Sequence, residues 1–287
     1  MALILDGKKI HSQVLEDLKS KIAIHLADGF VKPTLAIVQV GNNKESISYI
    51  HHKKKFGEKI GAEVVHIHLQ DTVSEADVLS EIQNLNTDES VHGIIVQLPL
   101  PKHIDREILI KNINPEKDVD GLSPLNVMGL WVNDSNTVLP ATTRGILTML
   151  EYYNIQVKGK KVVMVGRSTL VGKPTALALL NKGATVTVCH SHTEKLRDHT
   201  LEADIIISAA GIPRLISEDC VHSGQVVIDV GITFLKDETV QTLKGDVDFD
   251  SVSKIVSAIS PVPGGVGPLT VCSLFQNLYD AYKKKLS

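Results

Sequence analysis

The chain has 287 residues and a formal net charge of −3 at pH 7. Its length suggests about two domains that each bury a core, and its balanced charge argues against a dedicated nucleic-acid-binding protein, which usually carries a basic excess. The three cysteines, Cys189, Cys220 and Cys272, form no CxxC pair, which excludes a disulfide framework and offers no zinc-binding spacing.

Further classes are disfavoured by local features. The N-terminal segment "MALILDGKKIHSQ" has too short an apolar run for a signal peptide, and no stretch approaches the ~18 apolar residues of a membrane span. The segment "CHSHT" at 189–193 offers a cysteine and two histidines, but no second cluster completes a tetrahedral metal site. We therefore expect a soluble, cytoplasmic protein with no metal, no membrane association and no nucleic-acid partner.

The first half of the chain alternates helical patterns with short apolar runs. Helices are expected over about 8–27, 46–61 and 74–86, and strands over 34–41, 63–69 and 92–101. Ser74 is a plausible N-cap of the third helix. Continuous runs rich in β-branched residues indicate parallel strands buried on both faces, so this half predicts an α/β layer with crossover helices.

A change of pattern separates this half from the next. Residues 115–143 lack clear periodicity and are rich in Pro, Asn and Asp, which predicts a long functional loop leading to an interdomain hinge near 140–148. Further strands are expected at 160–166, 184–191, 203–211 and 225–231. The tail from 268 has helical spacing and ends in lysines, which suit a helix C-terminus.

The segment "VVMVGRSTLVGKP" at 162–174 predicts a strand, a glycine turn and the start of a helix. Gly166 allows the tight turn, Gly172 allows the helix to approach the strand, and the helix N-terminus offers amide donors to a phosphate. The match to GxGxxG is imperfect, because Ser168 replaces the middle glycine. An ordinary glycine-containing turn stays the alternative, but the surrounding β-α-β-α-β order favours a dinucleotide.

The residues after the second strand of this half favour NADP over NAD. An NAD site uses an acidic residue there to accept from the ribose 2′-hydroxyl, whereas this strand ends in "CHSHT" without a carboxylate. Arg167 in the glycine turn could pair with a 2′-phosphate, and Ser191 could donate to it.

A basic run in the second expected helix, "YIHHKKK", poses a separate question. The helical wheel places Lys53 or Lys54 beside apolar positions and turns Lys55 away, and Tyr49, four residues earlier, favours Lys53. A lysine on an apolar face is desolvated, which lowers its pKa and makes a neutral amine available. The alternative is a side chain whose stem merely covers apolar surface.

Polar residues elsewhere could join this lysine. Gln97 interrupts the apolar run "GIIVQLPLP" near the carboxyl end of a strand, where ligands of α/β sheets bind. Asp118 and Asp120 stand in "KDVDG", and loop acids of this kind are usually solvated or turn-forming. The segment "SPVPGGVGPLT" at 260–270 exposes backbone to which a ligand can approach closely.

The segments "YIHHK", "GIIVQLPLP", "PEKDVDG", "VGRSTLVGKP", "CHSHT" and "PVPGGVGP" follow one another in this order. Together they closely resemble the bifunctional methylenetetrahydrofolate dehydrogenase/methenyltetrahydrofolate cyclohydrolase family, over essentially the whole chain. The resemblance implies an N-terminal α/β catalytic domain (1–141 and 268–287) and a Rossmann NADP-binding domain (142–267), with a folate cleft between them. It also implies a closing helix that returns to the first domain, and a homodimer.

The implied reactions are oxidation of 5,10-methylenetetrahydrofolate by NADP⁺ and hydrolysis of the methenyl product to 10-formyltetrahydrofolate. The family's catalytic lysine falls on Lys53, its tyrosine on Tyr49, its glutamine on Gln97 and its pterin-binding aspartate on Asp120. Its NADP contacts fall on Gly166, Arg167, Ser168, Ser191 and Ile232, and its folate-contacting loop falls on Pro263 and Gly264.

The chain departs from the family pattern at one place. The family commonly has Pro-Cys-Thr-Pro where this chain has "PATT", so Ala141 lacks the thiol and Thr143 lacks the stiffening ring.

Three different functions also stay open. The first is a short-chain dehydrogenase, which also uses a Tyr-x-x-x-Lys pair. In that family the pair follows the glycine turn in the sequence, whereas in this chain the pair precedes the glycine turn. The second is the same fold with only one of the two activities, and the third is an NADP-binding sensor without turnover.

Overall fold

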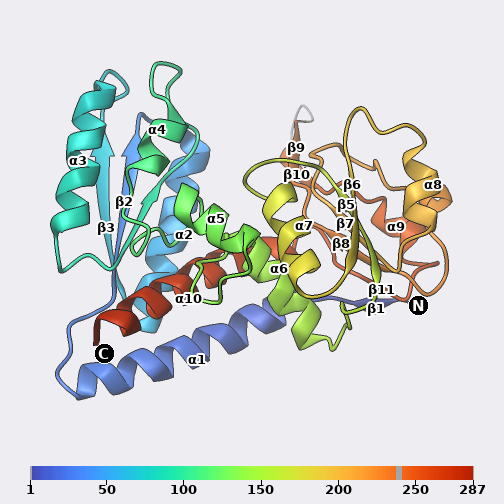
Figure 1. The fold of residues 1–287 in the computed structure, drawn as a ribbon, viewed down its shortest axis with the longest axis horizontal. Coiled ribbons are helices and arrows are strands. Elements are labelled where there is room, and N and C mark those ends of the chain that lie inside the picture. The colour runs from blue at the N-terminus through green and yellow to red at the C-terminus, as the bar shows by residue number, and fades with distance from the viewer. Residues whose placement is uncertain (1, 237–240, 287) are drawn as a thin grey trace. The chain divides into compact units, whose positions relative to one another are not determined.

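The computed structural model describes residues 2–236 and 241–286. The chain divides into two compact units: unit 1 comprises Met1–His11 and Thr142–Thr270, and unit 2 comprises Ser12–Ala141 and Val271–Ser287. Two of the three junctions fall inside the long helices α1 (Gly7–Ala27) and α10 (Val266–Leu286), both of which the sequence pattern predicts, and the third follows Ala141. Figure 1 labels the elements in chain order.

Unit 2 contains a three-stranded parallel sheet with the order β3-β2-β4. Its strands are β2 (Thr34–Val40), β3 (Glu63–Leu69) and β4 (Gly93–Val96). Every residue of the central strand β2 is buried, as a strand covered on both faces requires. Helix α3 (Glu75–Thr87) buries Val78, Ile82 and Leu85, one helical face, in the same apolar cluster as residues of β2 and β4. Ser74 caps this helix by accepting the Asp77 N–H, as predicted.

The last helix belongs to the same unit from Val271 onward, which confirms the predicted return to the first domain. The Phe275 ring of α10 lies 5.0 Å, centroid to centroid, from Phe56 of α2 (Lys44–Ile60). The Asn277 side chain donates to the carbonyl oxygens of Val119 and Leu139 at 2.8 and 2.9 Å. These bonds tie the segment that follows β4 to the closing helix.

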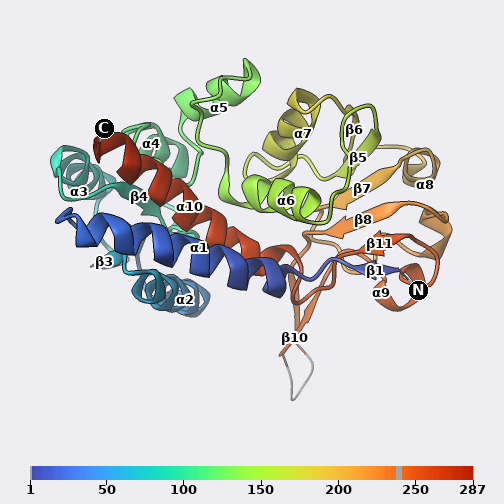
Figure 2. The same cartoon turned by 90° about the horizontal axis from the view of Figure 1, so that it is seen from below.

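Unit 1 contains a six-stranded parallel sheet with the order β1-β11-β8-β7-β5-β6, which Figure 2 shows from below. The strands are β1 (Leu3–Ile4), β5 (Lys161–Val165), β6 (Thr185–Cys189), β7 (Ile205–Ser208), β8 (Val226–Asp229) and β11 (Ala258–Ile259). Because β6 and β7 flank β5 on opposite sides, the chain reverses its strand order at β5. Such a reversal opens a crevice at the carboxyl ends of the strands, where nucleotides bind. The predicted Rossmann-type sheet is thus confirmed.

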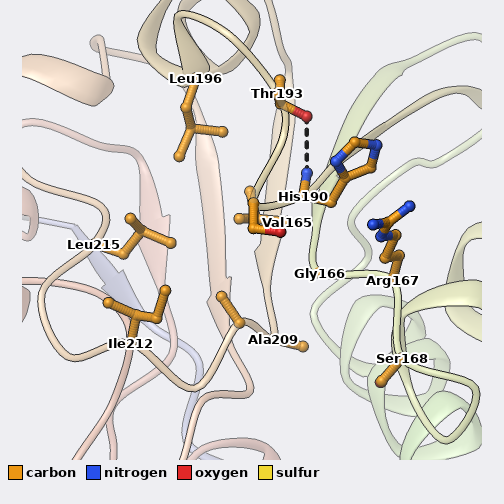
Figure 3. Close-up of a pocket in the computed structure, with 12 residues that line it drawn as sticks. Val165, Gly166, Arg167, Ser168, His190, Thr193, Leu196, Ala209, Ile212 and Leu215 are labelled. Carbon is orange, nitrogen blue, oxygen red and sulfur yellow. Dashed lines mark hydrogen bonds between the residues drawn. The ribbon is translucent and has the colours of Figure 1, made fainter.

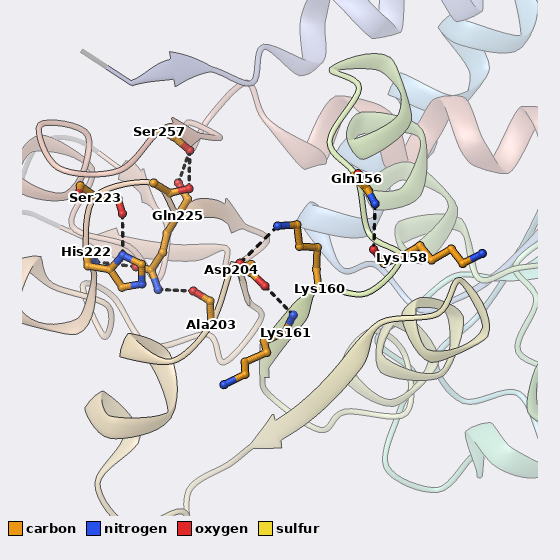
Figure 4. A network of polar contacts seen from close by, with 11 residues as sticks. Gln156, Lys158, Lys160, Lys161, Ala203, Asp204, His222, Ser223, Gln225 and Ser257 are labelled. Carbon is orange, nitrogen blue, oxygen red and sulfur yellow. Dashed lines mark hydrogen bonds and ion pairs between the residues drawn. The ribbon is translucent and has the colours of Figure 1, made fainter.

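A polar network joins the opposite, amino-terminal ends of these strands (Figure 4). One Asp204 carboxylate oxygen accepts the Lys161 backbone N–H at 2.8 Å, and the other lies 3.6 Å from the Lys160 amine. The buried Gln225 side chain donates to the carbonyls of Thr200 and Ala203, each at 2.7 Å. These contacts hold the strand starts together and leave the carboxyl ends as the open edge.

Residues 2–11 lie in unit 1, because β1 pairs in parallel with β11. The structure differs from expectation in one element. The predicted loop 115–143 contains α5 (Pro124–Trp131), since Ser123 caps its N-terminus and Pro124 suits its first turn. The predicted hinge near 140–148 contains the division between the two units after Ala141, and this segment is helical, as the start of α6 (Ala141–Tyr152).

Smaller elements complete the described chain. These are α4 (Arg106–Lys111), α7 (Gly172–Asn181), α8 (Leu196–Leu201), the 3-10 helix η1 (Glu218–Cys220), α9 (Phe249–Val252) and the antiparallel pair β9 (Thr233–Lys236) and β10 (Gln241–Lys244). Over residues 2–236 and 241–286, no helix combines the length and the apolar character that crossing a membrane demands.

Candidate active site

Helix α2 carries the basic run and distinguishes its three lysines. The Asn43 side chain caps the helix by accepting the Ser46 N–H, and Gly61 ends it in the left-handed region at φ 83°. Lys54 and Lys55 are exposed, whereas Lys53 is half-buried. The helix therefore turns one lysine of the run away from bulk water, the one that the spacing from Tyr49 favours.

The amine of Lys53 meets the side chain of Gln97, the first residue after β4. Lys53 Nζ donates to Gln97 Oε1 at 2.9 Å. Gln97 Nε2 donates to the Leu98 carbonyl at 2.8 Å, and the Ser46 hydroxyl donates to the same carbonyl at 3.0 Å. Because the Leu98 oxygen can only accept, it holds the NH₂ end of the Gln97 amide and leaves the oxygen facing the lysine.

Burial moves two ionisable groups toward their neutral forms here. Desolvation lowers the pKa of Lys53 below its usual value of 10.5, and the negative charge of Asp120 opposes this only in part. Desolvation likewise raises the pKa of Asp120 above its usual value, with Lys53 opposing and Asp118 reinforcing the rise. Each group thus lies in the field of the other, which brings a third predicted residue to Lys53 and Gln97.

Asp118 shapes the loop that presents Asp120. The buried Asp118 carboxylate accepts the Gly121 N–H at 3.0 Å, the Ser123 N–H at 2.6 Å and the Asn126 side-chain N–H at 2.9 Å. Gly121 has φ 71°, and a Cβ at this position would lie 2.7 Å from backbone atoms of Leu139 and Pro140. The backbone on both sides of Asp120 is therefore fixed. Sequence reasoning identifies Asp118 only as a loop acid. The signal for its structural role is that Gly121 and Ser123, whose N–H groups it accepts, follow it closely in the sequence.

Ser46 is a member of this group that sequence reasoning missed. It lies seven residues, about two helical turns, before Lys53 and so on the same face of α2. That spacing was the only sign that it belongs with the lysine. Tyr49, which was predicted, is 42% exposed on α2, one turn before Lys53.

A pocket of about 440 Å³ lies at the carboxyl ends of β5, β6 and β7 in unit 1. It is lined by Val165, Gly166, Arg167, Ser168, His190, Ser191, Thr193, Leu196, Ala209, Ala210, Ile212 and Leu215. Figure 3 shows Leu196, Ile212 and Leu215 on one side and Arg167, His190 and Ser168 on the other. The pocket therefore has one wall that suits a flat apolar ring and one that suits an anion.

The glycine turn is built for close approach of backbone. Gly166 has φ 115°, and a Cβ there would collide with the Ala209 carbonyl. A Cβ on Gly172 would collide with the Gly166 carbonyl, so α7 starts directly against the turn, as predicted. The Ser168 hydroxyl accepts the N–H groups of Val171 and Gly172, each at 3.2 Å. Ser168 thus stabilises the turn as well as lining the pocket.

The polar wall has no carboxylate among its lining residues. His190 and Ser191 follow β6 directly, where an NAD site would place an acid. The His190 ring accepts the His192 N–H on Nδ1 at 3.2 Å, so the neutral ring carries its proton on Nε2 as a donor. Donors from Arg167, His190 and Ser191 on this wall fit a phosphate group better than a ribose hydroxyl alone.

The remaining predicted residues are also in unit 1. Ile232 is 44% exposed and follows Gly231 after β8, and it is not one of the residues that line this pocket. Pro263 and Gly264 precede α10, and the Gly264 carbonyl accepts the Gly7 N–H at 2.9 Å. The predicted residues are therefore divided between a lysine-centred group in unit 2 and a nucleotide pocket and a loop in unit 1.

Comparison with known proteins gives matches over nearly all of the chain. The tetrahydrofolate dehydrogenase/cyclohydrolase catalytic domain matches residues 5–120, and the NAD(P)-binding domain of the same description matches residues 140–286. The bifunctional protein FolD of Aquifex aeolicus is 47% identical over 287 residues, which cover 100% of this chain and 97% of the relative.

Two solved structures are similar in fold along their whole length. The bifunctional FolD enzyme from Campylobacter jejuni has 42% identity and a TM-score of 0.96, with 99% of this chain and 100% of that chain covered. The Trypanosoma brucei FolD enzyme, complexed with NADP cofactor and inhibitor, has 35% identity and a TM-score of 0.95, with coverages of 99% and 98%.

Proposed function

The chain belongs to the tetrahydrofolate dehydrogenase/cyclohydrolase family, and from this premise we propose which of its residues carry the two reactions. It is a bifunctional enzyme that oxidises 5,10-methylenetetrahydrofolate with NADP⁺ and hydrolyses the methenyl product to 10-formyltetrahydrofolate. We assign the hydrolytic chemistry to Lys53 with Gln97 and Asp120, and the binding of NADP to the pocket at the ends of β5, β6 and β7.

The observation that carries this assignment is the half-buried Lys53 amine, 2.9 Å from the Gln97 carbonyl oxygen. Hydrolysis requires water to add to the electrophilic one-carbon bridge and to lose a proton. The lowered pKa of Lys53 makes a neutral amine available to take that proton. As the carbon–nitrogen bond breaks, the same amine returns that proton to the leaving pterin nitrogen. The remaining hydroxyl proton of the adduct is released to solvent as the formyl C=O forms, so that the lysine ends the cycle unchanged.

Gln97 and Asp120 support this proton transfer in different ways. The Gln97 amide cannot ionise, so it orients the lysine by accepting one N–H without stabilising the ammonium as strongly as a carboxylate would. Asp120 accepts hydrogen bonds from the amino edge of the pterin and fixes the ring. Tyr49 packs near the one-carbon bridge, and Pro263 and Gly264 contact the folate. These last roles rest on the resemblance of the motifs to those of the family.

The pocket in unit 1 fits NADP on three grounds. Gly166 lets the turn approach a pyrophosphate, α7 offers N-terminal amide groups, and the polar wall offers Arg167 and Ser191 to a 2′-phosphate. When bound, NADP⁺ accepts the hydride from the one-carbon bridge. Gly166, Arg167, Ser168 and Ser191 would hold the phosphates, the apolar wall would pack against a flat ring of the cofactor, and Ile232, after β8, would contact it.

Assembly and location belong to the same proposal. We assign the catalytic folate-binding role to residues 1–141 and 268–287, and the NADP-binding role to 142–267. The resemblance supports a homodimer, which light scattering of the purified protein tests. The three cysteines are buried thiols outside any disulfide, which suits a reducing cytoplasm, and fractionation of cells tests that location.

A paired assay tests the function as a whole. Purified protein receives methylenetetrahydrofolate with either NADP⁺ or NAD⁺, and absorbance follows the reduced nicotinamide and the methenyl compound together. We expect NADP⁺ to be the better oxidant and the methenyl signal to rise and then decay. Reduction without methenyl decay would leave a dehydrogenase alone, decay of added methenyl compound without reduction would leave a cyclohydrolase alone, and folate binding without turnover would leave a sensor.

A further inference from the structure

Unit 1 contains a pair of buried carboxylates, Asp229 and Asp246, that has no part in the reactions assigned above. Asp246 follows β10 and is fully buried, with 0% of its surface exposed. Its side chain accepts the Ser208 hydroxyl at 2.9 Å and the backbone N–H groups of Ala210 at 2.6 Å, Gly211 at 3.3 Å and Ile212 at 2.9 Å. Every one of these partners is a donor, so they suit a carboxylate that only accepts.

Asp229, at the end of β8, holds Asp246 in place. Its carboxylate accepts the backbone N–H groups of Gly231 at 2.9 Å, Asp246 at 3.0 Å and Val247 at 2.9 Å. The packing is reciprocal, because a Cβ on Gly231 would collide with the Asp246 carboxylate, and a Cβ on Gly245 would collide with that of Asp229. Each acid thus occupies the space that a glycine beside the other acid leaves free.

The backbone segment 210–212, which donates hydrogen bonds to Asp246, forms part of one wall of the nucleotide pocket. Ala210 and Ile212 both line that pocket, and Figure 3 shows the Ile212 side chain on its apolar side. Gly211 between them has φ 70°, and its carbonyl accepts the Thr233 hydroxyl at 3.2 Å. Three consecutive N–H groups that converge on one carboxylate define the course of this loop, which follows the end of β7 at Ser208.

We propose that Asp246 is a positioning residue of the dehydrogenase reaction, whose carboxylate fixes the 210–212 backbone as the apolar wall against which NADP binds. The proposal rests on the proposed function of this pocket. Asp229 acts through Asp246, since it places the Asp246 backbone and neighbours Gly231. Only the oxidation uses NADP⁺. A displaced 210–212 backbone should therefore impair the oxidation and leave the hydrolysis unchanged.

Asp246→Asn tests the proposal, since the amide keeps the shape but turns an N–H₂ group toward backbone donors. Because the amide repels backbone N–H groups that now bind the carboxylate, we expect the KM for NADP⁺ to rise about tenfold or more. The KM for methylenetetrahydrofolate and the hydrolysis of added methenyl compound, which needs no NADP⁺, should stay unchanged. Assays at about pH 8 avoid titration of Asp229, whose pKa burial raises to about 6.

Asp204→Asn is the matched control. This carboxylate also accepts a backbone N–H in unit 1, but at the amino-terminal ends of the strands (Figure 4), so its variant should keep the wild-type KM for NADP⁺. An unchanged KM in Asp246→Asn, or equal loss of both activities, would overturn the proposal. If this variant does not fold, Gly211→Ala replaces it, because the added methyl meets nothing within 4 Å and disturbs only the loop backbone; an unchanged KM for NADP⁺ there would overturn it equally.

The wild-type protein separates this proposal from the function on which it rests. Absence of NADP⁺-dependent oxidation in the wild type would contradict the assigned function of the pocket itself. Normal oxidation in the wild type, with a normal KM for NADP⁺ in the variant, would contradict the role of Asp246 alone.

Discussion

Lys53 Nζ and Gln97 Oε1 lie 2.9 Å apart, although 44 residues separate them in the chain. The contact joins α2 to the end of β4, and a third residue, Leu98, fixes the orientation of the Gln97 amide. An uncharged acceptor beside a half-buried amine is an arrangement in which the amine loses its proton more readily than a solvated lysine does. The first predictions follow from this pair.

Replacement of Lys53 by methionine removes the amine and keeps the apolar stem. We expect Lys53→Met to reduce the cyclohydrolase rate by about 10²-fold or more, the usual contribution of a positioned acid–base group, while the protein still binds NADP⁺. Lys54→Met is the matched control, because Lys54 is exposed and its amine lies 3.3 Å from His66 rather than near Gln97. Hydrolysis of the methenyl compound is measured for both, and equal loss in the two variants would contradict the role of Lys53.

The pH profile of hydrolysis tests the state of the same amine. Burial lowers the pKa of Lys53, so the neutral form that accepts a proton should appear at a lower pH than for a free lysine. We expect the logarithm of the enzyme-catalysed rate to rise with pH and to level off below 10.5. A rise that continues through that value would show an ordinary, solvated lysine.

Gln97→Glu replaces the side-chain NH₂ group by a carboxylate oxygen, and the direction in which it should shift the pKa of Lys53 can be predicted. A carboxylate at 97 would favour the ammonium form of Lys53, so the pKa of the amine should rise and the plateau should move to higher pH. The variant should recover activity in alkaline solution, which a variant that had merely lost its fold would not do. A loss of rate that is the same at every pH would argue against an electrostatic role for this pair.

Asp118 makes a separate prediction about the folate loop. Asp118→Asn presents an N–H₂ group to backbone donors that now bind a carboxylate, and we expect a loss of about 1–3 kcal/mol in the free energy of unfolding. The KM for folate should also rise, because the same bonds hold the loop of Asp120. Asp134→Asn is the control, since the Asp134 carboxylate accepts the Asn136 N–H in an exposed turn. Urea unfolding and steady-state kinetics provide the two measurements.

The elements that sequence reasoning predicted are those with a long, uniform pattern. The seven buried residues of β2 form one apolar run, and α3 repeats its buried positions at helical spacing from a recognisable cap. The two-residue strands β1 and β11 contain too few residues for any pattern, and their pairing depends on contacts between the two ends of the chain. The missed helix α5 is short, and its Ser-Pro start was the available signal.

The site was predictable in its residue types and less so in its geometry. Helical spacing narrowed the basic run to two lysines, and Tyr49 favoured Lys53, but only the tertiary contact with Gln97 distinguishes Lys53 from Lys54. The hydrogen bonds from the 210–212 backbone to Asp246 could not be predicted from the sequence, because the donors lie more than thirty residues before Asp246 in the chain. Thr143, which stands where the family commonly has a proline, shares a 3.0 Å hydrogen bond with Thr175 of α7.

Arg167 tests the preference for NADP over NAD. It lies on the polar wall of the pocket and would pair with the 2′-phosphate, which NAD lacks. We expect Arg167→Gln to lower kcat/KM with NADP⁺ by about 10–100-fold, as the loss of a charge-assisted hydrogen bond implies, and to change kcat/KM with NAD⁺ little. Lys173→Gln is the control, since Lys173 is exposed on α7 and does not line the pocket. Equal loss with both cofactors would contradict the assignment.

His92 gives a prediction about stability in acid. It is buried, its Nδ1 accepts the Thr34 N–H at 3.2 Å, and its ring packs edge-on against Tyr282. Burial, reinforced by the positive charges of Lys285 and Lys117, lowers its pKa from 6.5 to about 4. The unfolded chain therefore binds a proton at His92 below about pH 6.5, whereas the folded chain does so only near pH 4, so acid favours the unfolded state across this window.

His92→Gln removes this titration and keeps a carbonyl oxygen that can accept the Thr34 N–H. At neutral pH the wild type should be more stable, because the ring fills its site. As the pH falls from about 6.5 to 4 this advantage should shrink by up to about 3 kcal/mol, the free energy that the pKa shift represents. Urea unfolding followed by circular dichroism at several pH values measures the difference, and parallel curves for the two proteins would show that His92 titrates alike in the folded and unfolded chains.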